Sequence, residues 1–231
     1  MEPHNHQPLC CVKVVQLICA RLEEAAVKAQ QPTRVVSNRF PVAMVDEVER
    51  KLTAHVIAIV MESTIAVNLR IPSTNSEKTG FEDANGRTST APIVDYLSRI
   101  ARFTKSTVEA MILALIHLDM YIQRTHRALS LDVVHRLYFA SLVVNSKMHD
   151  EEWHSNYYYA RVAGVSLEEL NRLELLFLCV TEFSLIVPRK IYDAYAAVIR
   201  DIVCILCVVG EEDGNVILER SAKTAMLVAS F

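Results

Sequence analysis

The chain has 231 residues, of which 52% are hydrophobic and 22% are charged, a balance typical of globular proteins that bury a core without disulfides. Its 5 glycines and 7 prolines are few, which favours long helices over a many-stranded sandwich or barrel. The formal net charge of −3 and the lack of a lysine or arginine run argue against nucleic acid as a partner.

Features of the cysteines, the N-terminus and the most apolar stretch indicate the compartment. The 6 cysteines lie mostly in apolar runs and lack the spacing of a disulfide framework, which fits a reducing setting. The N-terminus, MEPHNHQPLCC, has no positively charged flank or cleavage site of a secretory signal. The apolar stretch at 202–209 is far shorter than the roughly 20 residues that span a bilayer. We therefore expect an intracellular chain, cytoplasmic or nuclear, without membrane association.

Two helices are predicted before residue 72. Residues 12–29 combine an apolar side with scattered charges. A second helix is expected to begin near Pro41, which suits a first turn, because apolar residues then recur every three or four positions. These residues are Val45, Val48, Leu52, Val56 and Ile59. The β-branched run at 64–69 leaves the end of this helix open.

A polar segment follows at 72–91, which is rich in Ser, Thr, Asn and Gly. It is longer than most connections inside a compact domain, so it predicts a linker. The predicted organisation is an N-terminal helical extension at 1–71, the linker at 72–91, a main domain at 92–204 and a C-terminal tail at 205–231.

Helix start signals divide the main domain into five predicted helices, at about 93–103, 107–124, 131–148, 167–181 and 189–208. Polar N-caps, two of them in capping boxes, and first-turn prolines provide these signals. The residues are Ser106 with Glu109, Ser166 with Glu169, Ser130, Pro92 and Pro188.

Two of these helices indicate how the domain packs. The helix at 107–124 is apolar almost all round, so other helices must enclose it. The helix at 131–148 carries small Ala140 and Ser141, which let a neighbouring backbone come close. The predicted fold class is therefore all-α, a bundle around a central helix.

Few residues of the chain suggest catalysis. His149, Asp150 and His154 could ligate a metal, but their spacing is not that of an HExxH motif and no cysteine joins them. Cys204 and Cys207 have redox spacing inside an apolar run, where buried cysteines are the better interpretation. No glycine-rich phosphate loop, GxSxG, Walker or kinase catalytic motif is present, so the sequence offers no nucleophile. His117, within the most apolar helix, is interpreted as a core residue.

Lys147 and Glu174 are charged residues among large apolar neighbours. Charges in such surroundings need partners. The spacing alone allows a Lys–Glu pair inside the fold, two unrelated side chains whose charged ends reach the solvent, or a contact with another molecule.

Three stretches resemble the cyclin box, and they look closest to that of the P/U-type cyclins, the phosphate-signalling group. They are Ser146–Asp150, Asn156–Ser166 and Leu167–Glu174. Shorter matches to the opening and the second helix of that box are Asp95–Ile100, Phe103–Lys105 and Ile116–Asp119. The resemblance covers residues 92 to 200. The first helix lacks the arginine of mitotic-type cyclins, so the resemblance gives Asp119 no arginine partner there.

The resemblance implies a single five-helix cyclin box that binds a cyclin-dependent kinase as a heterodimer and positions the kinase's C-helix. The chain is then a non-catalytic regulatory subunit with no cofactor and no metal. By resemblance, Lys147 reaches backbone carbonyls of the kinase and Glu174 holds the lysine in place. Asp150, Leu170 and Phe177 complete the expected kinase-binding set.

Two alternatives belong to other classes. The same helical fold could be a scaffold for a non-kinase protein, because fold does not fix function. A metal-dependent enzyme would instead use His149, Asp150 and His154.

Overall fold

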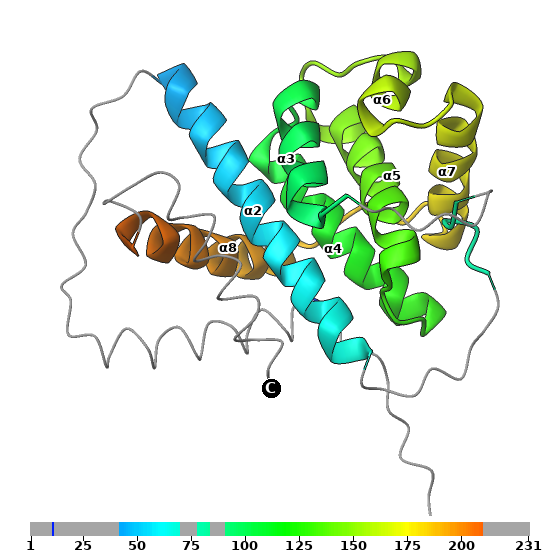
Figure 1. Ribbon diagram of the computed structural model, residues 1–231, viewed down its shortest axis with the longest axis horizontal. Helices are drawn as coiled ribbons and strands as arrows, with labels where there is room; N and C mark the ends of the chain where they lie inside the picture. Colours follow the sequence, from blue (N-terminus) through cyan, green and yellow to red (C-terminus); the bar gives the residue numbers. More distant parts are fainter. Residues whose placement is uncertain (1–10, 12–41, 70–77, 84–90, 210–231) are drawn as a thin grey trace, which may run out of the picture.

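Helices form the secondary structure of the residues that the computed structural model describes, which are 11, 42–69, 78–83 and 91–209 (Figure 1). The helices are α2 (Val42–Asn68), α3 (Ile93–Thr104), α4 (Val108–Thr125), α5 (Leu131–His149), α6 (Asn156–Ala163), α7 (Leu167–Val180) and α8 (Arg189–Val209). No strand occurs within these ranges, so the predicted all-α class is confirmed. None of the described helices is both long and apolar enough to cross a membrane.

The predicted helices of the main domain agree with α3, α4, α5, α7 and α8 to within two residues at each end. The sequence prediction missed α6, which has only 8 residues and no apolar stripe long enough to recognise. Its ends carry local signals, because the Ser155 hydroxyl accepts from the N–H of Tyr158 and Gly164 ends the helix with φ 77°. The helix predicted at 12–29 lies outside the described residues.

The capping predictions were partly wrong. The N-cap of α4 is Thr107, not Ser106, because the Thr107 hydroxyl accepts the N–H of Ala110 at 3.2 Å. Ser166 caps α7 as predicted and accepts the N–H of Glu169 at 3.0 Å. The two prolines of the main domain that were expected in first turns instead directly precede their helices, Pro92 before α3 and Pro188 before α8.

The central helix is α4, as predicted. Its residues from Ala110 to Asp119 are all buried, and it contacts α2, α5, α7 and α8. The approach of α5 is close because the hydroxyls of Ser141 and Tyr138 donate to the α4 carbonyls of Ala114 and Met111. The small Ser141 therefore lies where the sequence pattern predicted a close neighbour.

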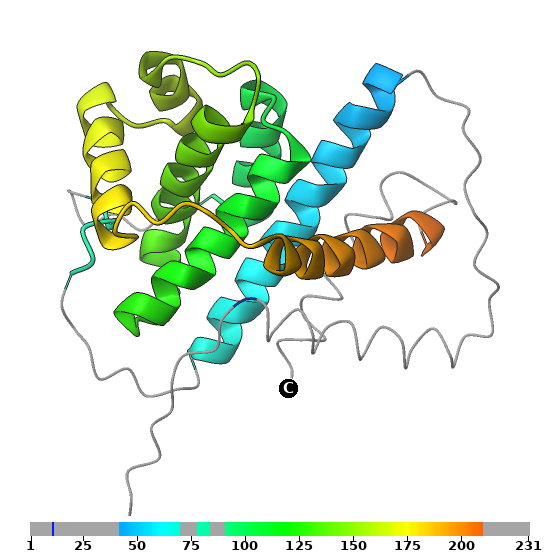
Figure 2. The same cartoon turned by 180° about the vertical axis from the view of Figure 1, so that it is seen from behind.

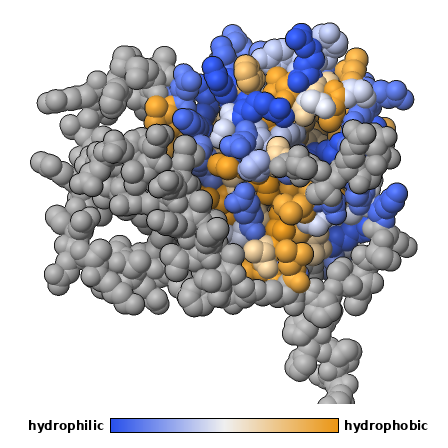
Figure 3. All heavy atoms as spheres, viewed as in Figure 1, coloured by the Kyte–Doolittle hydropathy of each residue, from blue (hydrophilic) through white to orange (hydrophobic). Residues whose placement is uncertain are grey.

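The long helix α2 shares the core of the main domain. Its residues 53–61 are all buried, and it packs on α3, α4 and α8. Figure 2 shows α8 crossing α2 on the side away from α6 and α7. In Figure 3 hydrophobic residues gather over the C-terminal half of α2, with mostly polar residues above them. The domain boundaries predicted from the sequence stay a prediction, but α2 is packed as a core helix.

Asp119 ties two further segments to the central helix. Its carboxylate accepts the backbone N–H of Cys11 at 2.6 Å and the hydroxyl of Tyr195, on α8, at 2.6 Å. The carboxylate is buried, so these hydrogen bonds offset its loss of hydration. Asp119 thus has partners other than an arginine of α3.

The two serine N-caps differ in a way that can be tested. Ser166→Ala should lower the free energy of unfolding by about 1 kcal/mol, because the Glu169 N–H loses its acceptor. Ser130→Ala is the matched control, since Ser130 precedes α5 without a side-chain cap bond, and its effect should be much smaller. Urea unfolding of both variants measures the difference, and equal losses would contradict the assignment.

Candidate functional site

The C-terminal end of α5, the start of α6 and the middle of α7 meet at one surface, where two charged side chains pair. Lys147 is in the last turn of α5, and its Nζ lies 2.6 Å from Oε1 of Glu174 on α7. The two side chains are 26% and 17% exposed, so the pair lies half-buried at the edge of the bundle. The interpretation as two unrelated side chains is therefore wrong.

A third residue completes this pair. Asn156, the first residue of α6, donates from Nδ2 to the second carboxylate oxygen of Glu174 at 2.8 Å. The same nitrogen donates to Oδ1 of Asn171, one turn before Glu174 on α7, at 2.7 Å. Lys147, Glu174, Asn156 and Asn171 therefore form one polar group, which we call the triple-helix junction because it joins α5, α6 and α7.

Asp150, which the resemblance placed in the kinase-binding set, is engaged inside the fold. Its carboxylate accepts the backbone N–H of Thr107, at 3.3 Å, and the Thr107 hydroxyl. Beside it the Ser146 hydroxyl donates to the Ser106 hydroxyl at 2.7 Å. These contacts fix the C-terminal end of α5 to the start of α4, and with it the backbone that carries Lys147.

Leu170 and Phe177, the two apolar members of that set, have no exposed surface. They lie on the stripe of α7 that faces the core, together with Leu173. Their spacing of three and four residues is the ordinary signal of a buried helix face and could have predicted this burial. The exposed apolar side chains nearby in the sequence include Met148, Trp153, Tyr157, Leu167, Leu175 and Phe183.

Phe183 is one of the exposed aromatics, with Trp153 and Tyr157, that sequence reasoning did not single out. It lies in the turn after α7 and is 63% exposed, and both it and Glu182 have positive φ, 55° and 53° respectively. Bulky residues rarely adopt this left-handed conformation, which costs roughly 1–2 kcal/mol per residue. The backbone N–H of Phe183 bonds the Leu178 carbonyl at 2.9 Å and holds the turn. The positive φ values here therefore terminate α7, as those of Lys105 and His126 terminate α3 and α4, and they leave the Phe183 ring exposed.

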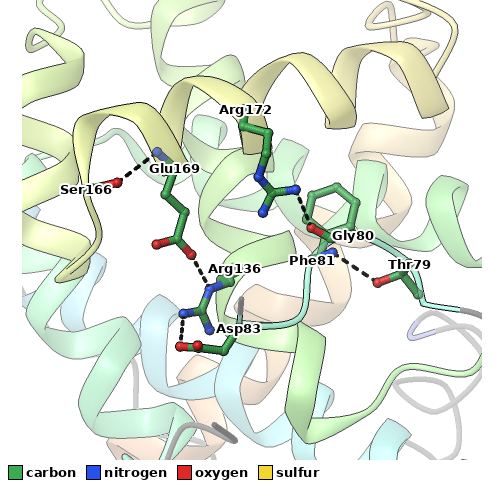
Figure 4. A network of polar contacts seen from close by, with 8 residues as sticks. All are labelled: Thr79, Gly80, Phe81, Asp83, Arg136, Ser166, Glu169 and Arg172. Carbon is green, nitrogen blue, oxygen red and sulfur yellow. Dashed lines mark hydrogen bonds and ion pairs between the residues drawn. The ribbon is translucent and has the colours of Figure 1, made fainter. Parts of the chain in front are cut away.

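A second ion pair joins α5 to α7 away from the triple-helix junction. Arg136 of α5 donates to Glu169 of α7 at 2.7 Å and to Asp83 at 2.6 Å (Figure 4). Burial alone would lower the pKa of Arg136, but the hydrogen bonds and charges of Glu169 and Asp83 outweigh it and raise the pKa. The Glu169 side chain therefore pairs with Arg136 and does not complete the predicted capping box with Ser166.

Asp83 belongs to residues 78–83, which we call the strap because they lie across α5 and α7. Phe81 is fully buried, and its ring meets that of Tyr121 edge-on at 5.6 Å. Arg172 of α7 donates to the Gly80 carbonyl at 2.8 Å (Figure 4). Gly80 has φ +87°, a conformation that is strained for residues with a side chain, so glycine is favoured there. The strap thus fixes the spacing of the two helices that carry Lys147 and Glu174.

Comparison with known proteins identifies this arrangement. A family model described as cyclin matches residues 12–185, which is most of the chain. The chain belongs to the cyclin family. It is 38% identical over 119 residues to Cyclin-P1-1 of Oryza sativa subsp. japonica, covering 50% of this chain and 44% of that protein. It is 32% identical over 147 residues to Cyclin-U2-1 of Arabidopsis thaliana, covering 62% and 66%.

These relatives confirm the resemblance to P/U-type cyclins. A third, Cyclin-U4-1 of Arabidopsis thaliana, is 37% identical over 110 residues, which cover 46% of this cyclin and 53% of that protein. The chain spans about half the length of several curated relatives that it matches. The bundle around α4 is accordingly a cyclin-box fold, in which α6 adds a sixth described helix to the five predicted for the main domain and α2 packs on the same core.

The described side chains that were considered for catalysis or metal binding pack against other residues in this cyclin. His117 is fully buried and its Nδ1 lies 2.9 Å from the Leu113 carbonyl. Burial lowers its pKa, so the ring is neutral near pH 7, as expected of a core histidine. The described residues contain no group of three or more metal-ligating side chains, and His154 packs on Tyr158, with ring centroids 4.3 Å apart. The side chains of Cys204 and Cys207 lie outside the described residues.

The hydrogen bonds of Glu82 in the strap predict how the free energy of unfolding depends on pH. Glu82 accepts both the N–H and the hydroxyl of Thr79 and the N–H of Gly80, at 2.7 to 2.9 Å. Burial opposes ionisation, but these hydrogen bonds outweigh it and lower the pKa below its ordinary 4.5. The folded protein thus binds this proton more weakly than the unfolded chain, and the resulting stability is present above pH 4.5 and lost as the pH falls through the folded pKa.

Wild type should therefore be more stable than Glu82→Gln near pH 7, and the difference should shrink as the pH falls from 5 toward 3. Urea unfolding of both proteins across this range measures it, because other carboxylates titrate equally in both and cancel. A difference that stayed constant with pH would contradict the expected role of the carboxylate charge.

Proposed function

We propose that this cyclin is a non-catalytic regulatory subunit that binds a cyclin-dependent protein kinase as a heterodimer and positions the kinase's C-helix. The observation that carries the proposal is the half-buried Lys147–Glu174 pair, at 2.6 Å, at the surface where the end of α5 and the start of α6 meet α7. We also propose that the complex forms inside the cell, in the cytoplasm or nucleus.

The chemistry of Lys147 suits a partner that presents carbonyl groups. A lysine ammonium has three donors and no acceptor, and Glu174 takes one of them. Glu174 also restrains the flexible lysine stem and balances its charge at the edge of an interface. The remaining donors are available to backbone carbonyls, which helix ends and loops of a kinase supply.

The effect on the kinase would be conformational. An active kinase needs its C-helix turned inward so that the glutamate of this helix reaches the ATP-binding lysine. A partner that binds the inward state more tightly shifts the population toward it. No residue of the cyclin needs to touch the substrate for this.

Exposed apolar side chains on α5 and after α7 support docking on a protein. Leu175 follows Glu174 in the sequence of α7, Met148 follows Lys147 in α5, and Phe183 lies in the turn after α7. Apolar side chains that exclude water around a polar contact strengthen it. We place Phe183, and not the buried Phe177, in the kinase interface.

The pair can be tested directly. Lys147→Ala and Glu174→Ala should each weaken binding of a cyclin-dependent kinase at least about tenfold, because each leaves the other charge without its partner at the interface. Lys190→Ala, at an exposed lysine of α8, is the control and should bind as wild type does. Affinity is measured by co-purification and calorimetry, with circular dichroism to verify the helices.

Binding retained in both variants would remove the pair from the mechanism. A wild-type chain that binds no cyclin-dependent kinase but captures a non-kinase protein would favour the scaffold alternative instead.

The two phenylalanines give a second test. Phe183→Ala should weaken kinase binding about tenfold or more and leave folding intact, because the side chain is exposed. Phe177→Ala should instead lower the free energy of unfolding by about 3–5 kcal/mol, because it removes a buried ring. Calorimetry measures the first and urea unfolding the second. Wild-type affinity in Phe183→Ala would exclude this residue from the interface.

A further inference from the structure

Asn156 is placed to hold the carboxylate oxygen of Glu174 that does not contact Lys147. Its Nδ2 lies 2.8 Å from Oε2 of Glu174, while Lys147 occupies Oε1 at 2.6 Å. The same nitrogen donates to Oδ1 of Asn171 at 2.7 Å, so both of its hydrogens have acceptors. An ionised carboxylate can only accept, so the amide nitrogen, and not the oxygen, must face Glu174.

The backbone under Asn156 is fixed by its surroundings. It is the first residue of α6, directly after the N-cap Ser155. Two residues on, the Tyr158 hydroxyl donates to the Phe103 carbonyl at the end of α3, at 2.8 Å. The amide of Asn156 is therefore presented from a helix start that is held on one side by its cap and on the other by α3.

The consequence concerns the freedom of Glu174. A glutamate held only by a lysine can still rotate, and the lysine side chain is itself flexible. Binding a partner would then have to restrict both side chains, at a cost in entropy. With a different donor on each oxygen, the plane of the carboxylate is fixed relative to α5 and α6. Lys147 is then held in one direction before a partner arrives, which reduces the entropy lost on binding.

The neutral amide suits this position. A lysine or arginine at 156 would compete with Lys147 for the single carboxylate, and an aspartate would place a second negative charge against Glu174. An amide adds a hydrogen bond without adding charge, so Glu174 remains the counter-ion of Lys147 alone.

We propose that Asn156 is a positioning residue for partner binding, which acts by fixing Glu174 and through it Lys147. This inference rests on the proposed function and adds α6 to the elements on which the kinase contact depends. Asn156 itself need not touch the kinase.

The test compares variants in the full-length chain by calorimetry with the kinase that wild type binds. Asn156→Ala should weaken binding about three- to tenfold, because the hydrogen bond to a charged group is lost. Asn156→Asp should weaken it more than about tenfold, because two carboxylates then face each other. The double variant Asn156→Asp with Glu174→Gln should recover part of this loss, since the amide introduced by the second substitution can donate to the new carboxylate while its oxygen still accepts from Lys147.

Arg161→Ala is the control on the same helix, because Arg161 is exposed and lies over the Tyr157 ring, away from Glu174 and from the contacts that hold the start of α6. Its affinity should stay within about twofold of wild type, since its side chain is not part of the junction. Melting temperatures are recorded in parallel. A purely structural role of α6 would lower stability without making affinity depend on the combination of charges at 156 and 174.

The outcomes separate this inference from the function on which it rests. If wild type binds no kinase, the proposed function fails. If wild type binds the kinase and both Asn156→Ala and Asn156→Asp bind it as tightly as wild type does, the positioning role is wrong and the proposed function stands. If Asn156→Asp is weaker but the double variant recovers nothing, the effect does not act through Glu174, which also overturns the inference.

Discussion

The middle of the helix α4 has no polar face that could be exposed to water, so the other helices must pack around it. Its middle residues are buried all round, so α5 and α7 must cover it on one side and α2 and α8 on another. The approach of α5 is close because Ser141 is small and donates to an α4 carbonyl. The end of α5, where Lys147 lies, is therefore placed by the packing of the core and not by local structure.

Two ion pairs then join α5 to α7, and they differ in how fully their donors are used. Arg136 is enclosed by Glu169 and by Asp83 of the strap, so two carboxylates of the chain itself share its guanidinium. Lys147 has Glu174 as its acceptor and keeps donors at a partly exposed surface. An ion pair between α5 and α7 thus stabilises the packing of the two helices in the first case, and in the second it suits the binding of a partner.

The boundaries of most helices could be predicted from the sequence, because capping residues and apolar periodicity act over three or four neighbours. Local reasoning was less successful where several residues compete for one role. Thr107 caps α4 because Ser106 is turned inward to Ser146, and α6 was missed because eight residues carry too little periodicity. For Leu170 and Phe177 the resemblance suggested a contact, whereas their periodic spacing indicated the core, where both lie.

The sequence by itself determined the all-α class, the central helix and the charged residues that need partners, since these follow from composition and short-range periodicity. Only the tertiary structure decided that Lys147 and Glu174 are paired, that Asn156 holds the second oxygen and that Phe183 is exposed. It also placed Phe81, from a segment with the composition of a linker, in the core. The physical reason is that these contacts join residues far apart in the chain, and their distances depend on how whole helices pack.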